Sequence, residues 1–198
     1  MKCSVCRQPA ARLCGACHFV PYCGESCASA DWKVHGIEAH VRIEEEDEHD
    51  IDQVWPGIWI GGVAALRTLD QHGIAAVVTA LPRDRHVDDS VLEERVGGRP
   101  WFRVYWYDSP DQELPRAELE AAADFIDRYR NQKGGVLVHC WAGHSRSVTI
   151  VLFYLLTRTG QFARVQDALA HVRKTRTFAD PNEGFLEQLE RLWKTARR

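Results

Sequence analysis

The sequence predicts an α/β protein in which helices flank a mainly parallel central sheet, preceded by a small finger that metal holds together. From residue 51 onwards, short apolar runs alternate with longer helical stretches, a pattern typical of strands joined by helices in a parallel sheet. Six of the seven cysteines instead fall within residues 3–27. A segment this short buries too little apolar surface to fold alone, so metal must hold it.

The first 40 residues carry enough ligands for two zinc ions. Cysteine and histidine residues follow one another here in four closely spaced pairs, and eight such ligands suit two tetrahedral zinc sites. The expected ligands are Cys3, Cys6, Cys14, Cys17, Cys23, Cys27, His35 and His40. We therefore predict a finger over residues 1–40 with two structural zinc ions.

An acidic segment at residues 44–50 follows the finger. Such a run is typical of a solvated linker, placed here at residues 41–50, although it could also pair with a basic partner. The net charge of the chain is −3, which gives no general attraction to nucleic acid. The basic cluster of Arg173, Lys174 and Arg176 is accordingly interpreted as the end of a helix.

The larger domain is predicted over residues 51–198. Strands are predicted over 74–80, 101–106 and 135–139, and helices over 64–72, 115–132, 145–159, 163–174 and 181–196. Pro115 and Pro181 suit first helical positions, while Gly73, Gly134 and Gly160 suit helix ends. This alternation favours a mainly parallel sheet with a functional loop at the carboxyl end of a strand.

Cys140 lies where the last predicted strand stops and an apolar helix is about to begin. Five residues separate it from Arg146, and a loop this short must curl with its N–H groups inward, forming an anion site at a helix N-terminus. These donors favour the thiolate, which is the nucleophilic form of cysteine. The Arg146 guanidinium matches two phosphoryl oxygens. The residues expected around a bound phosphate are Trp141, Ala142, Gly143, His144, Ser145 and Arg146.

Three further residues have expected roles in a reaction at this loop. Ser147 would donate a hydrogen bond to the departing sulfur, and His139 would hold the loop through its backbone rather than act as a base. The leaving group needs a proton as its bond to phosphorus breaks. Asp108, which follows a predicted strand and opens a turn, is the expected acid; Asp111 is the alternative, and Glu113 is expected to be solvated.

The arrangement of His139, Cys140, five residues, Arg146 and Ser147 resembles the signature of the cysteine-dependent dual-specificity protein phosphatases. The resemblance extends over residues 51–195. Residues 51–61 are similar to the opening strand of that family, although Trp59 stands where tyrosine is more usual, and residues 181–189 resemble its closing helix, whose asparagine braces the catalytic loop. The resemblance implies the cysteine-phosphatase fold, a phosphocysteine intermediate, an aspartate acid at Asp108 and no cofactor for catalysis.

The finger resembles the MYND zinc finger, with Tyr22 before Cys23 and with Asp31 and Trp32 before His35. Ligand pairs interleave in that family, which implies one zinc on Cys3, Cys6, Cys23 and Cys27 and the other on Cys14, Cys17, His35 and His40. The family usually ends with a cysteine at the position of Ala39, so a helix here must end or distort before His40 to let it reach the metal. His18 and His49 are the alternatives.

These patterns predict a protein phosphatase that acts on phosphotyrosine and on phosphoserine or phosphothreonine. The alternatives are the same chemistry on a phosphoinositide, an RNA 5′-phosphate or a phosphoglucan, or a phospho-reading scaffold without catalysis. An intact set of Cys140, Arg146 and Asp108 favours an enzyme, and residues 143–147 look like the protein-directed type. The MYND resemblance implies that the finger recruits a proline-containing peptide of a protein partner.

The expected location is intracellular, in the cytoplasm or the nucleus. Six cysteines are assigned to the finger and one to the loop, so none is left for a disulfide, which indicates a reducing compartment. Apart from the helix after Cys140, which is too short, no apolar run reaches transmembrane length, and no leader is recognised at the N-terminus. We therefore expect no association with a membrane.

Overall fold

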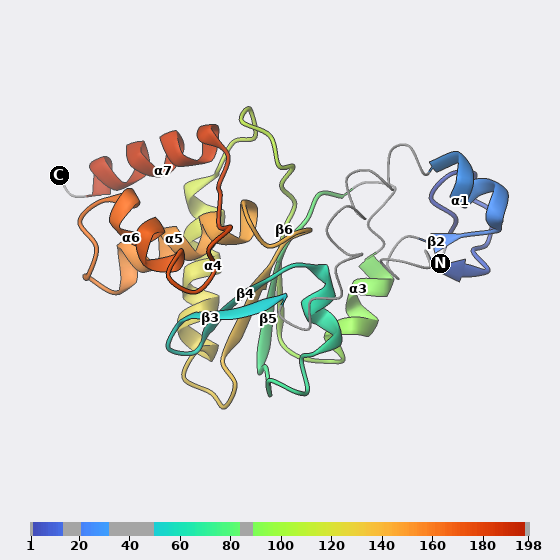
Figure 1. Cartoon of the computed structure of the whole chain (residues 1–198), viewed down its shortest axis with the longest axis horizontal. Coiled ribbons are helices and arrows are strands. Elements are labelled where there is room, and N and C mark those ends of the chain that lie inside the picture. The colour runs from blue at the N-terminus through green and yellow to red at the C-terminus, as the bar shows by residue number, and fades with distance from the viewer. Residues whose placement is uncertain (1, 14–20, 32–49, 84–88, 197–198) are drawn as a thin grey trace. The chain divides into compact units, whose positions relative to one another are not determined.

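The computed structural model describes residues 2–13, 21–31, 50–83 and 89–196 (Figure 1). The chain divides into two compact units, one of residues 1–49 and 82–98 and the other of residues 50–81 and 99–198. None of the helices within the described ranges has the length and apolar character needed to cross a bilayer.

The smaller unit contains short elements. Strands β1 (Arg12–Leu13) and β2 (Pro21–Tyr22) pair antiparallel, and helix α1 (Glu25–Asp31) follows. The unit also includes helix α3 (Asp89–Val96), which the sequence analysis did not predict. Of its buried residues, only Leu92 and Val96 have the four-residue spacing of an amphipathic helix, and Val91 is adjacent to Leu92, so the helix is short and weakly patterned.

The larger unit is built on a five-stranded sheet in the order β3-β4-β7-β5-β6. The strands are β3 (Ile51–Trp55), β4 (Ile58–Gly61), β5 (Ala76–Ala80), β6 (Trp101–Val104) and β7 (Val136–His139). Only the β3–β4 pair is antiparallel, so the prediction of a mainly parallel sheet is confirmed.

The opening segment forms two strands rather than one. The chain reverses between β3 and β4 at Gly57, whose φ of 73° is strained for residues with a side chain. A Cβ atom there would also overlap the carbonyl group of Arg130. Glycine at this turn therefore lets the hairpin form beside the C-terminal end of helix α4 (Arg116–Tyr129).

The helices of the larger unit begin and end close to their predicted bounds, with one exception. They are α4 (Arg116–Tyr129), α5 (Arg146–Arg158), α6 (Val165–Val172) and α7 (Glu183–Ala196). The predicted helix over 64–72 is wrong: a 3₁₀ helix, η2 (Val63–Arg67), is followed by turns. Thr68 caps the end of this 3₁₀ helix, where its backbone N–H and its hydroxyl both donate to the Ala65 carbonyl.

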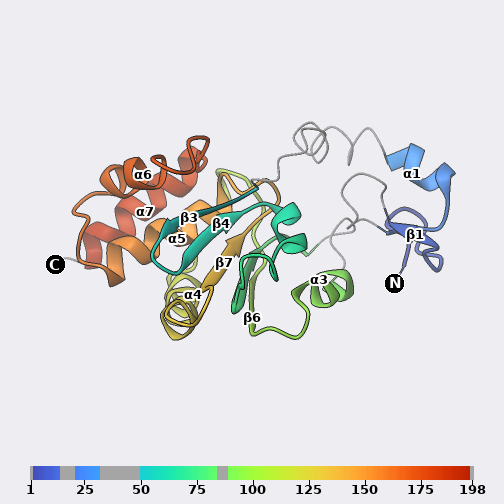
Figure 2. The same cartoon turned by 60° about the horizontal axis from the view of Figure 1, so that its bottom comes forward.

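Helices α4 and α5 pack against one face of the sheet, and α6 and α7 lie against α5 (Figure 2). On that face, alternate residues of the strands belong to one apolar cluster that continues to Cys140. Every residue of α5 from Arg146 to Leu156 is buried. The predicted core face of α4, which consists of Leu119, Ala122, Ala123 and Ile126, is buried as well.

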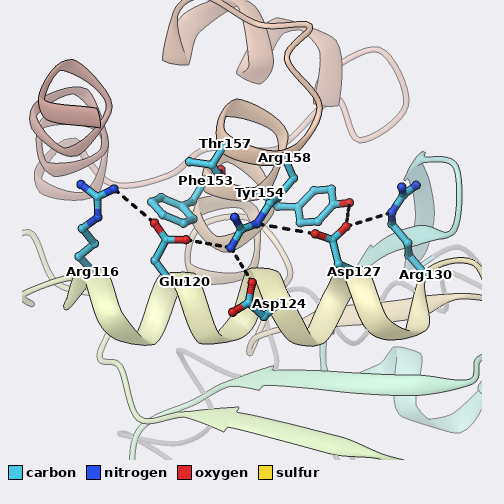
Figure 3. A network of polar contacts seen from close by, with 9 residues as sticks. All are labelled: Arg116, Glu120, Asp124, Asp127, Arg130, Phe153, Tyr154, Thr157 and Arg158. Carbon is cyan, nitrogen blue, oxygen red and sulfur yellow. Dashed lines mark hydrogen bonds and ion pairs between the residues drawn. The ribbon is translucent and has the colours of Figure 1, made fainter. Parts of the chain in front are cut away.

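A polar network joins α4 to the far end of α5 (Figure 3). The Arg158 Nη2 atom donates to Glu120 at 2.9 Å and to Asp124 at 2.6 Å, and Tyr154 donates its hydroxyl to Asp127 at 2.6 Å. These bonds tie the C-terminal part of α5 to α4.

The Tyr154 hydrogen bond gives a testable stability difference. Tyr154→Phe should lower the free energy of unfolding by about 1 kcal/mol near neutral pH, since Asp127 loses a donor. Burial, reinforced by Asp127, raises the pKa of Tyr154 above its usual range. The unfolded chain therefore ionises Tyr154 at lower pH than the folded chain does, and this stabilisation is lost as the pH rises above about 10.

The measurement is urea denaturation of wild type and variant at neutral pH and above about pH 10. The difference between the two proteins should shrink at the higher pH. Tyr129→Phe, whose ring packs on Phe125, is the control. A difference of the same size at both pH values would contradict the assignment.

Candidate active site and metal centre

The loop of residues 140–145 joins β7 to α5 at the carboxyl end of the central strand. β7 lies between β4 and β5, so the loop emerges from the middle of the sheet. Gly143 has a φ of 71°, and a Cβ atom there would overlap the backbone of Gly61 and the guanidinium of Arg176. Only glycine fits this position, and it lets the loop turn tightly above the sheet.

The carbonyl groups of this loop are bound by other parts of the protein. The Val63 N–H donates to the Trp141 carbonyl at 2.9 Å, the Asp180 N–H donates to the His144 carbonyl at 2.7 Å, and Arg176 Nε donates to the Gly143 carbonyl at 2.6 Å. Within the described chain, the N–H groups of Ala142, Gly143 and Ser145 donate to no backbone carbonyl. Donors left available at a helix N-terminus are suited to bind an anion.

The nucleophile candidate is buried under this loop. Cys140 is 1 % exposed, and its Sγ atom lies 3.3 Å from the Ser147 hydroxyl. Arg146 is buried in the first turn of α5, and its Nη1 atom donates to the Trp106 carbonyl at 3.4 Å. Its Nε atom has no hydrogen-bond acceptor among the described residues. This donor faces the Asp108 carboxylate in an ion pair at 3.4 Å and is available to bind an oxygen of a ligand.

The structure brings Asp108 to the same loop. The Ser145 hydroxyl donates to Asp108 Oδ1 at 2.6 Å, and Asn182 Nδ2 donates to the same oxygen at 2.9 Å. Asp108 Oδ2 lies 3.4 Å from Arg146 Nε in an ion pair. The Ser145 hydroxyl therefore positions the candidate acid, while the Ser145 backbone N–H remains among the loop donors.

Asp111, the alternative acid, lies in the turn after Asp108. It is exposed, and its backbone N–H donates to the Ser109 hydroxyl at 3.4 Å. Glu113 is exposed, as predicted. The geometry thus favours Asp108 as the acid of the two.

His139 is fully buried and supports the loop. Burial, together with the positive charges of Arg103 and Arg146, lowers its pKa to about 4, so it is neutral at physiological pH. Its Nδ1 atom lies 3.2 Å from the Cys140 carbonyl and therefore carries the proton, while Nε2 accepts from the Thr79 hydroxyl at 2.7 Å. Both ring nitrogens are occupied, which agrees with a structural role rather than with a general base.

The other predicted substrate residues lie in the loop itself. Trp141, Ala142 and His144 are half-buried, and Gly143 is buried. Any contribution of Trp141, Ala142 and His144 to anion binding would come from their backbone N–H groups, whereas at Gly143 a side chain is excluded.

Sequence reasoning missed Arg176, which it interpreted as part of a helix end. Arg176 lies beyond the end of α6, is completely buried, and donates to the carbonyl groups of Gly143 and Ala142. The sequence contains no local signal for this role, because the acceptors lie more than 30 residues away in the chain.

The structure gathers one of the two predicted zinc ligand sets. The sulfur atoms of Cys3, Cys6, Cys23 and Cys27 all lie within 4.8 Å of one another. Sulfur ligands at about 2.3 Å from a tetrahedral zinc ion are about 3.8 Å apart, so the four thiols fit this metal. Although burial opposes a charge on Cys3, backbone hydrogen bonds from Cys6, Cys23 and Val5 lower its pKa to about 6, which favours a thiolate ligand.

A buried hydrogen bond supports this cluster. The Tyr22 hydroxyl donates to Asp31 at 3.0 Å, and both side chains are buried. The bond ties β2, which precedes Cys23, to α1, which carries Cys27. The other predicted ligands and the two alternatives lie outside the described residues; they are Cys14, Cys17, His35, His40, His18 and His49.

Family models match both parts of the chain. Residues 58–194 match the dual specificity phosphatase catalytic domain, and residues 3–38 match the MYND finger. Dual specificity protein phosphatase 1 of Arabidopsis thaliana is 35% identical over 170 residues, which cover 80% of this chain and 79% of the relative. Dual specificity protein phosphatase 15 of Homo sapiens is 34% identical over 137 residues, which cover 69% of this chain and 44% of the relative.

Solved structures agree with these matches. The crystal structure of DUSP15 has a TM-score of 0.62 and 28% identity, over 75% of this chain and 90% of that one. Human DUSP28 has a TM-score of 0.63 over 75% of this chain and 96% of that one; at 24% identity it shows the fold alone. With the catalytic-domain match and the cysteine cluster, these findings show that the chain belongs to the dual specificity phosphatase family and carries a MYND finger.

Proposed function

We propose that this enzyme hydrolyses phosphotyrosine and phosphoserine or phosphothreonine in proteins through a phosphocysteine intermediate. The observation that carries the proposal is the joint placement of Cys140, Arg146 and Asp108 around one loop with available N–H donors. A thiol, a guanidinium and a carboxyl group are the nucleophile, the charge stabiliser and the proton donor that phosphate monoester hydrolysis needs.

In the first step, the Cys140 thiolate attacks phosphorus and the bond to the leaving oxygen breaks. Arg146 and the loop N–H groups stabilise the non-bridging oxygens as charge develops on them. Asp108 donates its proton to the leaving alkoxide or phenoxide. Its Oδ1 atom accepts from Ser145 and Asn182, and its Oδ2 atom, which lies 3.4 Å from Arg146 Nε, is the oxygen proposed to carry this proton.

In the second step, water attacks the phosphocysteine and the phosphorus–sulfur bond breaks. The Asp108 carboxylate takes a proton from the attacking water, and inorganic phosphate leaves. The Ser147 hydroxyl, 3.3 Å from Cys140 Sγ, stabilises the departing thiolate. The enzyme returns to its starting protonation state.

The finger is proposed to recruit a protein partner through a proline-containing peptide. The match of residues 3–38 to the MYND family and the four-cysteine cluster support a zinc-bound interaction module. We propose two structural zinc ions in residues 1–40, an acidic linker at 41–50 and a catalytic domain over 51–198, in a protein of the cytoplasm or nucleus.

Cys140→Ser should abolish turnover of para-nitrophenyl phosphate while binding of tungstate persists, because the N–H donors and Arg146 remain. Turnover measured by absorbance and tungstate binding measured by calorimetry test this. Arg146→Lys should weaken both, since lysine cannot replace the planar fork. Retained turnover in purified Cys140→Ser would rule out the phosphocysteine route.

Asp108→Asn should slow hydrolysis of an alkyl phosphate or phosphoserine peptide by on the order of 10²–10⁴-fold, the usual contribution of a general acid. It should slow hydrolysis of an aryl phosphate with a good leaving group much less, because that group departs without a proton. Rate constants on both substrates give the comparison, and Asp111→Asn is the matched control. Equal losses of rate on both substrates, or a larger loss of rate in Asp111→Asn, would show that Asp108 is not the general acid.

Elemental analysis of the full chain should find two zinc ions, and Cys6→Ser should leave one. Removal of zinc by a chelator should leave hydrolysis of a small aryl phosphate largely unchanged, since no zinc takes part in the proposed chemistry. One zinc ion in the wild type would remove the second site, and loss of turnover on chelation would show that metal supports the catalytic domain.

A further inference from the structure

Arg176 makes a full set of hydrogen bonds beneath the phosphate-binding loop. The side chain is 0 % exposed. Its five N–H groups meet five acceptors: the carbonyl groups of Gly143, Ala142 and Ile60 and the carboxylates of Asp52 and Asp50. Phe178 covers the guanidinium with its ring at 4.4 Å. A buried guanidinium is tolerated when it is paired and fully hydrogen bonded, as it is here.

We propose that Arg176, with Asp50 and Asp52, is a positioning unit that sets the direction of the N–H groups in the loop. The inference rests on the proposed function of that loop as a phosphate site. In this proposal none of the three residues contacts substrate. They act through the loop backbone, whose carbonyl groups Arg176 binds.

The planarity of the peptide bond connects Arg176 to the anion site. In a trans peptide, the C=O and the next N–H point in opposite directions. Arg176 Nη2 and Nε bind the carbonyl groups of Ala142 and Gly143, at 3.4 Å and 2.6 Å. The N–H groups of Gly143 and His144 belong to the same two peptides, so they must point away from Arg176, toward the hollow of the loop.

The aspartates hold Arg176 in register with the sheet. Asp52 Oδ2 lies 2.8 Å from Nη1 and Asp50 Oδ1 lies 3.3 Å from Nη2, so each terminal nitrogen is shared between a carboxylate and a carbonyl. Nη1 also donates to the Ile60 carbonyl at 3.3 Å. The guanidinium therefore ties the loop to the β3–β4 edge, where the acidic segment ends.

Arg158 offers a matched control within the same unit. It is also an arginine held by carboxylates, from Glu120, Asp124 and Asp127, but it joins α5 to α4 at the C-terminal end of α5 (Figure 3). Its replacement should weaken packing between the two helices without changing the hydrogen bonds of the loop.

The test compares Arg176→Lys with Arg158→Lys in the full chain. Tungstate binding is measured by calorimetry, kcat and KM are measured on para-nitrophenyl phosphate, and the free energy of unfolding is measured in urea. Lysine keeps the charge but offers three donors from one point, so it cannot hold both carbonyl groups. Arg176→Lys should weaken tungstate binding about tenfold, which is the loss of affinity expected when one charged hydrogen bond is removed. It should also raise KM.

Arg158→Lys should bind tungstate as the wild type does, even where it is less stable. Asp52→Asn is the second variant, for use if Arg176→Lys does not fold. It keeps an oxygen acceptor for Arg176 but lacks the charge, and it should weaken tungstate binding by roughly threefold. Wild-type tungstate affinity in Arg176→Lys, or an equal loss in Arg158→Lys, would overturn the proposal. Because tungstate binding needs no turnover, an inactive wild type that still shows these differences would refute the proposed function and leave the positioning role standing.

Discussion

The orientation of four consecutive peptide groups is the constraint on which the site depends. The carbonyl groups of Trp141, Ala142, Gly143 and His144 are each bound by a donor outside the loop. These donors come from η2, from the segment after α6 and from the residues before α7. By binding these carbonyl groups, the elements around the loop orient the N–H groups of the same peptides toward the place where a phosphate would bind.

Helix α5, which begins at the loop, makes polar contacts at both ends of its buried length. At its start, Arg146 and Ser147 are buried with Cys140. At its end, Arg158 and Tyr154 bind acids of α4 (Figure 3). The contacts of Arg146 and Ser147 hold the first turn of α5 beside the thiol. The bonds to α4 stabilise the packing of the two helices at the end of α5 away from the loop. Apolar burial is not directional, so specific hydrogen bonds at each end define these contacts.

Local sequence pattern was sufficient for the strand, loop and helix around Cys140, because an apolar strand, a short turn and an apolar helix are adjacent in the chain. The resemblance to the MYND family predicted that one zinc ion would be bound by Cys3, Cys6, Cys23 and Cys27, which the structure brings together. Local pattern wrongly predicted a helix over 64–72, where a 3₁₀ helix is instead capped by Thr68 and followed by turns. It also missed the role of Arg176, whose acceptors lie 33 to 126 residues away in the sequence. Composition near Arg176 is that of an ordinary helix end, so only the tertiary structure reveals its role.

Asp108 is joined to the loop of Cys140 by the Ser145 hydroxyl and by its ion pair with Arg146. Ser145 donates to Asp108 and accepts from the backbone N–H of Asn182, while the Asn182 side chain donates to Asp108 and accepts from the Phe185 N–H at the start of α7. Ser145 is itself part of the loop proposed to bind the phosphate. The proposed proton donor is thus held by a side chain of that loop, so we expect a change in loop conformation to alter anion binding and protonation of the leaving group together.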